Sequence, residues 1–145
     1  MTPAGPLDDD PRPDPHDRLR APEFEAMLAE MRDICLALPE VSEIETFGSP
    51  TWQAGRKSFA SLWNHEAGPE FSFKADPIES AALLEDERIY VPKYTGHCGW
   101  LNLSLGDDPD EVDWDEVADL VVGSYRIQAL KRMLAALDAR PGPRN

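Results

Sequence analysis

The fold is indicated most clearly by one stretch of sequence, TWQAGRKSFASLW, which covers residues 51–63. Two runs of alternating side chains, 51–54 and 57–63, flank a turn that contains Gly55. A period of two is typical of β-strands, and a glycine between two such runs is typical of a hairpin turn. These residues therefore predict an antiparallel β-hairpin at the centre of the fold.

Alternation also predicts which side chains of the second strand share a face. Phe59, Ser61 and Trp63 are expected on one face. Ser58, Ala60 and Leu62 are expected on the other.

Helices are predicted on both sides of this hairpin, where apolar residues recur every three or four positions. In chain order, the predicted elements are a helix at 23–38, strands at 51–54, 57–63 and 70–75, a short helix at 77–86, strands at 88–91 and 100–105, and a helix at 114–137. This order predicts an α+β domain with an antiparallel sheet. Because each long helix has one apolar side, the N- and C-terminal helices are expected to pack on one face of that sheet.

Two of the predicted helices begin with capping signals. Asp76 precedes Pro77 and Glu79, an order in which the Asp caps the helix and the Pro occupies its first position. Asp113 and Glu116 form a similar pair before the last helix.

The ends of the chain differ in composition from its centre. Residues 1–22 contain six prolines and the run Asp8-Asp9-Asp10, so they carry too few apolar side chains to offset the entropy of ordering. We predict a flexible tail at 1–22, a single domain at 23–138 and a short flexible tail at 139–145.

The charge of the chain is strongly acidic but unevenly distributed. There are 28 Asp and Glu against 14 Lys and Arg, a net charge of −14, yet residues 46–65 and 88–106 contain no acid. If the protein binds an anion or a nucleic acid, these two windows are where the charge favours it. The sequence pI of about 4.4 predicts that any binding to DNA is weak, because nucleic-acid-binding domains usually have a basic face.

Several other classes of protein are not indicated. No segment approaches the roughly 18 apolar residues of a membrane span, and the N-terminus lacks an apolar signal-peptide core, so a cytoplasmic protein is expected. Cys35 and Cys98 form neither a disulfide framework nor a zinc motif. Cys98 follows His97, but neighbouring side chains diverge in direction, so we predict no catalytic dyad. We also predict no metal site and no cofactor.

The acid-free windows and the strand that lies between them carry cations interleaved with aromatic rings. Cations can contact phosphates, and rings can stack on bases or on a flat ligand. The candidate binding residues are Trp52, Arg56, Lys57, Lys74, Lys93, Tyr94, His97 and Trp100.

Six short motifs occur together in this chain. They are LPEVSE at 38–43, FGSPTW at 47–52, GRKSFA at 55–60, FKADP at 73–77, VPKY at 91–94 leading to GWL at 99–101, and SYR at 124–126. In this order they resemble the MmcQ/YjbR family over residues 24–137. The resemblance implies a small bacterial α+β domain of CyaY-like or double-wing architecture, without a known enzymatic reaction. It also implies DNA binding, with the hairpin around Gly55 and the loop around Gly96 as the two wings.

Three functions remain open at this stage. The first is weak DNA binding through the two wings, with phosphate contacts from Arg56, Lys57, Lys74 and Lys93. The second is a pocket for a small molecule or anion, lined by Trp52, Lys74, Tyr94, His97 and Trp100. The third is a protein-interaction module that uses the acidic helices.

Overall fold

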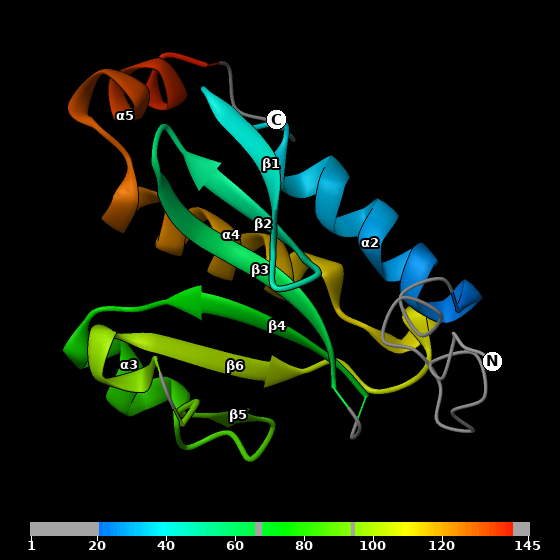
Figure 1. Ribbon diagram of the computed structural model, residues 1–145. Coiled ribbons are helices and arrows are strands. Elements are labelled where there is room, and N and C mark those ends of the chain that lie inside the picture. Colours follow the sequence, from blue (N-terminus) through cyan, green and yellow to red (C-terminus); the bar gives the residue numbers. More distant parts are fainter. Residues whose placement is uncertain (1–20, 66–67, 94, 141–145) are drawn as a thin grey trace, which may run out of the picture.

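A twisted antiparallel sheet organises the structure, which is a computed structural model that describes residues 21–65, 68–93 and 95–140 (Figure 1). Six strands form the sheet, and each is antiparallel to its neighbours. In their order across the sheet, the strands are β1 (Val41–Thr46), β2 (Ser49–Ala54), β3 (Lys57–His65), β4 (Gly68–Lys74), β6 (Trp100–Ser104) and β5 (Ile89–Tyr90). The predicted α+β fold with an antiparallel sheet is confirmed.

The helices follow the predicted order, and the two long ones lie on the same face of the sheet. They are α2 (Pro22–Cys35), α3 (Pro77–Leu83), α4 (Trp114–Gln128) and α5 (Lys131–Asp138), with two 3₁₀ turns, η2 (Gly96–Cys98) and η3 (Pro109–Glu111). Figure 1 shows α4 behind the strands and α2 beside β1, and both helices contribute to the same core cluster. Both predicted caps form: the Glu79 amide donates to Asp76 at 2.8 Å, and the Glu116 amide donates to Asp113 at 3.2 Å.

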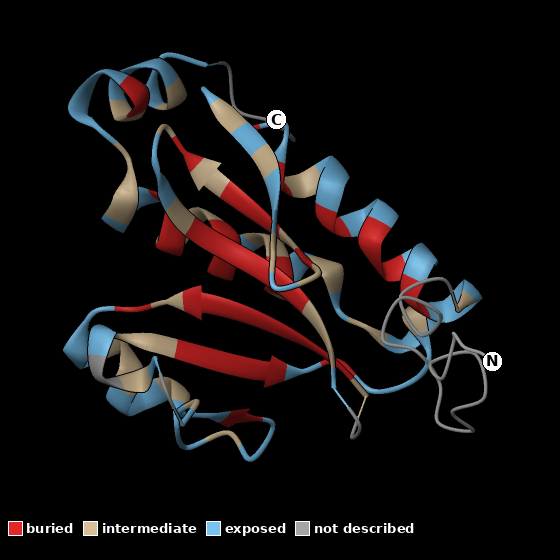
Figure 2. Cartoon of the chain, viewed as in Figure 1, coloured by how far each residue is buried: buried red, intermediate tan, exposed pale blue. Residues whose placement is uncertain are grey.

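The hydrophobic core lies between these helices and one face of the sheet, which we call the helix-covered face (Figure 2). Leu62, Phe71, Leu103 and Ile89 are paired in register across β3, β4, β6 and β5, so their side chains share this face. All are buried. The helices contribute fully buried side chains from Met27, Met31, Val117 and Val121.

The side chains of α4 also join parts of the sheet by hydrogen bonds. The Ser124 hydroxyl donates to the Phe59 carbonyl at 2.6 Å and accepts from the Lys74 amide at 2.8 Å. It therefore bridges β3 and β4 beyond the last residue pair of their ladder. The Tyr125 hydroxyl donates to the Pro39 carbonyl at 2.6 Å, which holds the segment before β1.

The predicted alternation along β3 is wrong at Phe59 and at Ser58, which pairs with Gln53 and therefore faces away from Ala60 and Leu62. The register between β2 and β3 shifts after the Trp52–Ala60 pair, and Phe59 has no partner in the ladder. At such a bulge the extra side chain is redirected. The Phe59 ring packs edge-on against Tyr125 of α4, with 5.4 Å between ring centroids, so it lies on the helix-covered face and not beside Trp63.

Two predicted elements need correction. The helix expected at 114–137 is two helices, because Ala129 adopts an extended conformation with ψ 152°. No proline or glycine causes this break; instead α5 turns beneath the β2–β3 hairpin, where Met133 is fully buried and a Cβ on Gly55 would lie 2.8 Å from its methyl group. The strand β1 was not predicted at all.

The predicted tails lie mostly outside the described residues. α2 begins at Pro22, one residue before the predicted domain boundary, and residues 1–20 and 141–145 are not described. Among the helices that are described, none has the length and apolar character that a membrane crossing requires.

Candidate functional site

Both predicted wings lie at the same end of the sheet. The first is the β2–β3 turn at Gly55 and Arg56. The second precedes β6, whose first residue Trp100 pairs with Lys74, the last residue of β4. Because β2 and β4 end where β3 and β6 begin, the two loops project from one end, at the left of Figure 1.

This end also holds described cations that form no ion pair, beside the acids Asp76 and Glu79 that follow β4. Four arginines of the described chain form ion pairs, namely Arg32, Arg88, Arg126 and Arg132. Four other described cations form no salt bridge with a described residue and lie at this end; they are Arg56, Lys57, Lys74 and Lys131. We call this region the cationic end.

Lys131 is placed at the cationic end by the contacts of the neighbouring helix residues. The Gln128 amide donates to the Ser58 carbonyl at 2.9 Å, just below the β2–β3 turn. Lys131 begins the next helix, whose Met133 lies beneath Gly55.

The opposite end of the sheet is acidic. The β3–β4 turn, the start of α2 and the segment after β6 meet there, and a depression of about 390 Å³ lies between them. Its lining includes Glu23, His65 and Asp107. Asp108, Asp110, Glu111 and Asp113 follow in the same segment. We call this region the acidic end, and no Lys or Arg of the described residues lines its depression.

The prediction of Trp52 as a binding residue is wrong for this structure. Trp52 pairs with Ala60 on the helix-covered face and has no exposed surface. Its indole nitrogen donates to Glu43 at 3.0 Å, and Glu43 also binds Arg32 of α2. Trp52 therefore holds β2 to β1 and α2, and it lies on the opposite face from Trp63.

The remaining predicted residues divide between the cationic end and the second loop. Lys93 is exposed and lies before η2, and His97 lies within η2. Tyr94 lies outside the described residues. The loop is tied to β4, because the Ala75 amide donates to the Gly99 carbonyl at 3.1 Å. Lys74 and Trp100 are brought together, but the predicted pocket lacks Trp52.

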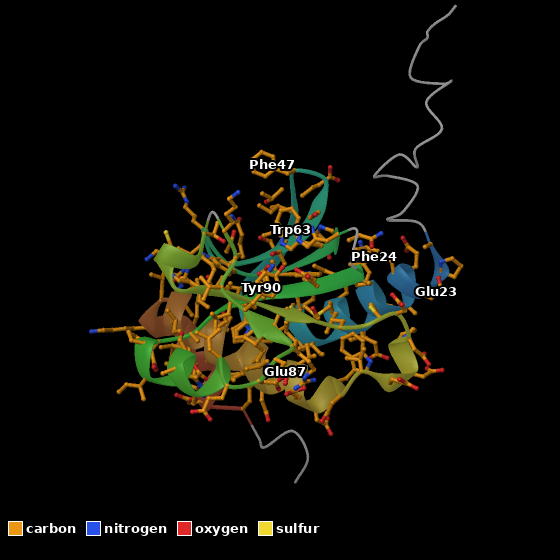
Figure 3. All side chains as sticks on the ribbon, turned by 90° about the horizontal axis from the view of Figure 1, so that it is seen from below. Glu23, Phe24, Phe47, Trp63, Glu87 and Tyr90 are labelled. Carbon is orange, nitrogen blue, oxygen red and sulfur yellow. The ribbon has the colours of Figure 1, made fainter. Side chains whose placement is uncertain are left out.

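The face of the sheet away from the helices carries a second group of polar residues. One row crosses all six strands in register and consists of Ile44, Thr51, Ser61, Ser72, Asn102 and Tyr90. Because β-strand side chains alternate, Glu70, Lys74 and Trp100 share this face. We call it the open face, since Figure 3 shows the helices on the other side of the sheet.

A buried carboxylate organises the centre of the open face. Glu70 is 5% exposed and accepts hydrogen bonds from the Tyr90 hydroxyl and, at 3.0 Å, from the Asn102 amide. The Ser72 hydroxyl donates to Asn102 at 2.6 Å, and His65 Nε2 lies 3.5 Å from Glu70. Burial, followed by the bond to Glu70, raises the pKa of Tyr90 above its usual value. All three contacts are made by Glu70 Oε1, which acts here as a structural acceptor.

Sequence reasoning did not single out Glu70, Ser72, Asn102 or Tyr90, although it named Lys74 and Trp100 on the same face. The signal is present in the sequence: Phe71 and Phe73 alternate with Glu70, Ser72 and Lys74 along one strand, so the two sets occupy opposite faces. Each of these residue types is ordinary on its own, and only the register brings them beside Asn102.

The two cysteines are free, and they differ in exposure. Cys35 is fully buried, and burial raises the pKa of its thiol, which makes it a poor nucleophile. Cys98 is exposed within η2. No cluster of metal-ligating side chains occurs among residues 21–65, 68–93 and 95–140.

Comparison with known proteins agrees with this architecture. The crystal structure of Deinococcus radiodurans protein DR2400, with a DUF419 domain, is similar to this chain, with a TM-score of 0.61 and 19% sequence identity; the match covers 81% of this chain and 94% of that one. At this identity the similarity shows a shared fold alone. No curated protein matches the chain. The sequence model of the YjbR family matches residues 36–127, more than half of the 145 residues, and the chain therefore belongs to the YjbR family.

Proposed function

We propose that this protein is a binding domain without enzymatic activity, which contacts DNA phosphates through its cationic end. The observation that carries the proposal is the separation of charge. Arg56, Lys57, Lys74 and Lys131, which form no ion pair among the described residues, lie at the end of the sheet where both predicted wings project, beside the acids Glu40, Asp76 and Glu79, whereas no described Lys or Arg lines the depression at the opposite end. Phosphate contacts by Lys and Arg position a protein on DNA.

The overall charge makes this binding weak and oriented. A net charge of −14 repels DNA at long range, so only an approach by the cationic end is favourable. With roughly two to four phosphate contacts, the affinity should fall with salt at a log–log slope of about −2 to −4.

The chemistry of the buried groups supports a binding role. The Cys35 thiol is sealed in the core, and the Glu70 carboxylate is held by Tyr90 and Asn102. Neither group is placed as a nucleophile or a general base for a substrate.

The test replaces the two cations at the β2–β3 turn while matching net charge. Arg56→Gln with Lys57→Gln makes the chain more negative by two charges, and so does Ala26→Glu with Ala29→Glu on the exposed side of α2. Fluorescence anisotropy with a labelled duplex should show about a tenfold loss of affinity for the first pair of substitutions. The log–log salt slope should also be smaller in magnitude by about 2.

The control pair should have a much smaller effect, because it changes only the long-range field. Equal losses for the two pairs, or no binding of wild type to duplex at about 50 mM salt, would remove the proposal.

A further inference from the structure

Aromatic side chains line the open face from the acidic side to the cationic end. Register places Trp63 beside Glu70 and Trp100 beside Lys74, all on the same face. Four residues of β4 separate these positions, which corresponds to about 13 Å along the strand. Tyr90, 41% exposed, lies between them on β5. The rings are therefore arranged along a path that ends at a lysine.

One of these rings already forms part of a stack. The Trp63 and His65 rings are nearly parallel, with an interplanar angle of 5° and 5.9 Å between centroids. The Trp63 indole nitrogen donates to the Ser61 hydroxyl at 2.7 Å, which fixes the ring orientation. A parallel, fixed ring is the kind of platform on which an unpaired base stacks, whatever its identity.

The floor between the rings is small, and its carboxylate, Glu70, is buried and accepts hydrogen bonds at Oε1. Thr51, Ser61 and Ser72 are buried, and their side chains are short. The Ser72 hydroxyl and the Glu70 carboxylate are both paired with Asn102. A flat ring on this face would therefore contact mainly the partly exposed aromatic side chains above this floor.

Phe47 provides an independent observation on the same side of the sheet. Its side chain is 94% exposed at the tip of the β1–β2 turn, and Figure 3 shows it projecting beyond Trp63, away from the helices. Phe47 has φ 50° and Gly48 has φ 81°, a turn that ordinarily favours Asn at the first position. Packing within the described residues explains neither why residue 47 is a phenylalanine nor why its ring is exposed.

The charge of the chain favours a single strand over a duplex. A duplex carries one phosphate charge per about 1.7 Å of axis and a single strand one per about 3.4 Å, so the single strand is repelled less by an acidic protein. Stacking on aromatic rings adds affinity that salt screens weakly. An acidic protein with rings and one cationic end is better suited to unpaired bases than to a paired helix.

From these observations we infer that the open face binds unpaired bases of single-stranded DNA while the cationic end holds the phosphates. Bases stack on Trp63, Trp100 and the exposed Phe47, and Lys74 contacts the backbone where the ring path ends. The inference rests on the proposed function and specifies the form of DNA that the protein prefers.

The experiment compares oligo-dT of about 12 nucleotides with a duplex of equal length, by fluorescence anisotropy on the full chain. We expect wild type to bind the single strand at least about fivefold more tightly, with quenching of tryptophan fluorescence. Trp63→Leu should weaken the single-strand complex about tenfold and Phe47→Asn about threefold. Both variants should leave duplex binding unchanged.

Two choices keep this test independent of folding. Phe47→Asn suits the turn, so it preserves the structure even if Trp63→Leu does not. Ile78→Ala is the matched control, because Ile78 is 86% exposed on α3, away from the open face, and its removal should change neither affinity.

Several results would overturn the inference. Equal affinity for single strand and duplex, or no effect of Phe47→Asn and Trp63→Leu, would show that the rings do not bind bases; Arg56→Gln with Lys57→Gln would then still test the phosphate contacts separately. If thymidine monophosphate bound as tightly as oligo-dT, the ligand of the open face would be a mononucleotide and not a strand. A dimer in sedimentation that Phe47→Asn dissociates would assign the face to a second copy. If wild type bound neither the single strand nor the duplex, both proposals would be removed.

Discussion

The two faces of the sheet are built from the same strands but bury opposite kinds of side chain. On the helix-covered face, Phe71 pairs with Leu103, and both are almost fully buried against α2 and α4. One residue along, on the open face, Ser72 pairs with Asn102, and both are also buried. Similar burial therefore has two different physical causes.

The difference lies in what replaces water on each face. Apolar side chains gain free energy when they leave water, so the helix-covered face is stabilised by area and packing. Polar groups gain little from burial unless they are paired, and the open face is stabilised by the bonds that join Glu70, Ser72 and Tyr90 through Asn102. The helices do not cover the open face, so its partly exposed rings are the side chains available to a partner.

The largest expected effect is a core truncation on the helix-covered face. Phe71 is fully buried and stacks on Phe73 with 5.0 Å between ring centroids. Phe71→Ala should lower the free energy of unfolding by about 3–5 kcal/mol, because it removes buried apolar area and leaves a cavity. Urea denaturation followed by circular dichroism measures this. A loss below about 1 kcal/mol would mean that this face is not a packed core.

A smaller effect is expected when the polar network of the open face is cut. Asn102→Ala removes the amide that donates to Glu70 and the oxygen that accepts from Ser72. The buried groups that lose their partner should destabilise the fold by about 1–3 kcal/mol. Ser104→Ala is the matched control on the same strand, because Ser104 is exposed and should change stability by less than about 0.5 kcal/mol. Equal effects of the two substitutions would contradict the network.

The helix-covered face was largely predictable from the sequence, because period and polarity agree there. Phe24, Met27 and Met31 recur at helical spacing, and the hairpin around Gly55 has alternating strands. The strand β1 could not be found in this way. Its apolar residues Val41 and Ile44 fall on opposite faces, and acids stand between and beside them.

The candidate site was predictable only in part, because it depends on register and on contacts between distant residues. Composition correctly marked Arg56 and Lys57 as the exposed cations of an acid-free window. It could not show that Trp52 faces the helices while Trp63 faces away, since the bulge at Phe59 interrupts the alternation that relates them. Nor could it show the pairing of Ser72 with Asn102, which are 30 residues apart.

The smallest expected effect concerns Phe47, and its sign is opposite to the others. A non-glycine residue in the left-handed region is strained by about 1–2 kcal/mol, and Phe47, with φ 50° and 94% exposure, gains no burial in return. Phe47→Asn places the favoured residue before Gly48 and should raise the free energy of unfolding by about 0.5–1 kcal/mol. Thermal denaturation measures this against Ile78→Ala. If stability instead falls, the Phe47 ring packs against the fold, and it cannot be a side chain kept exposed for a partner of the open face.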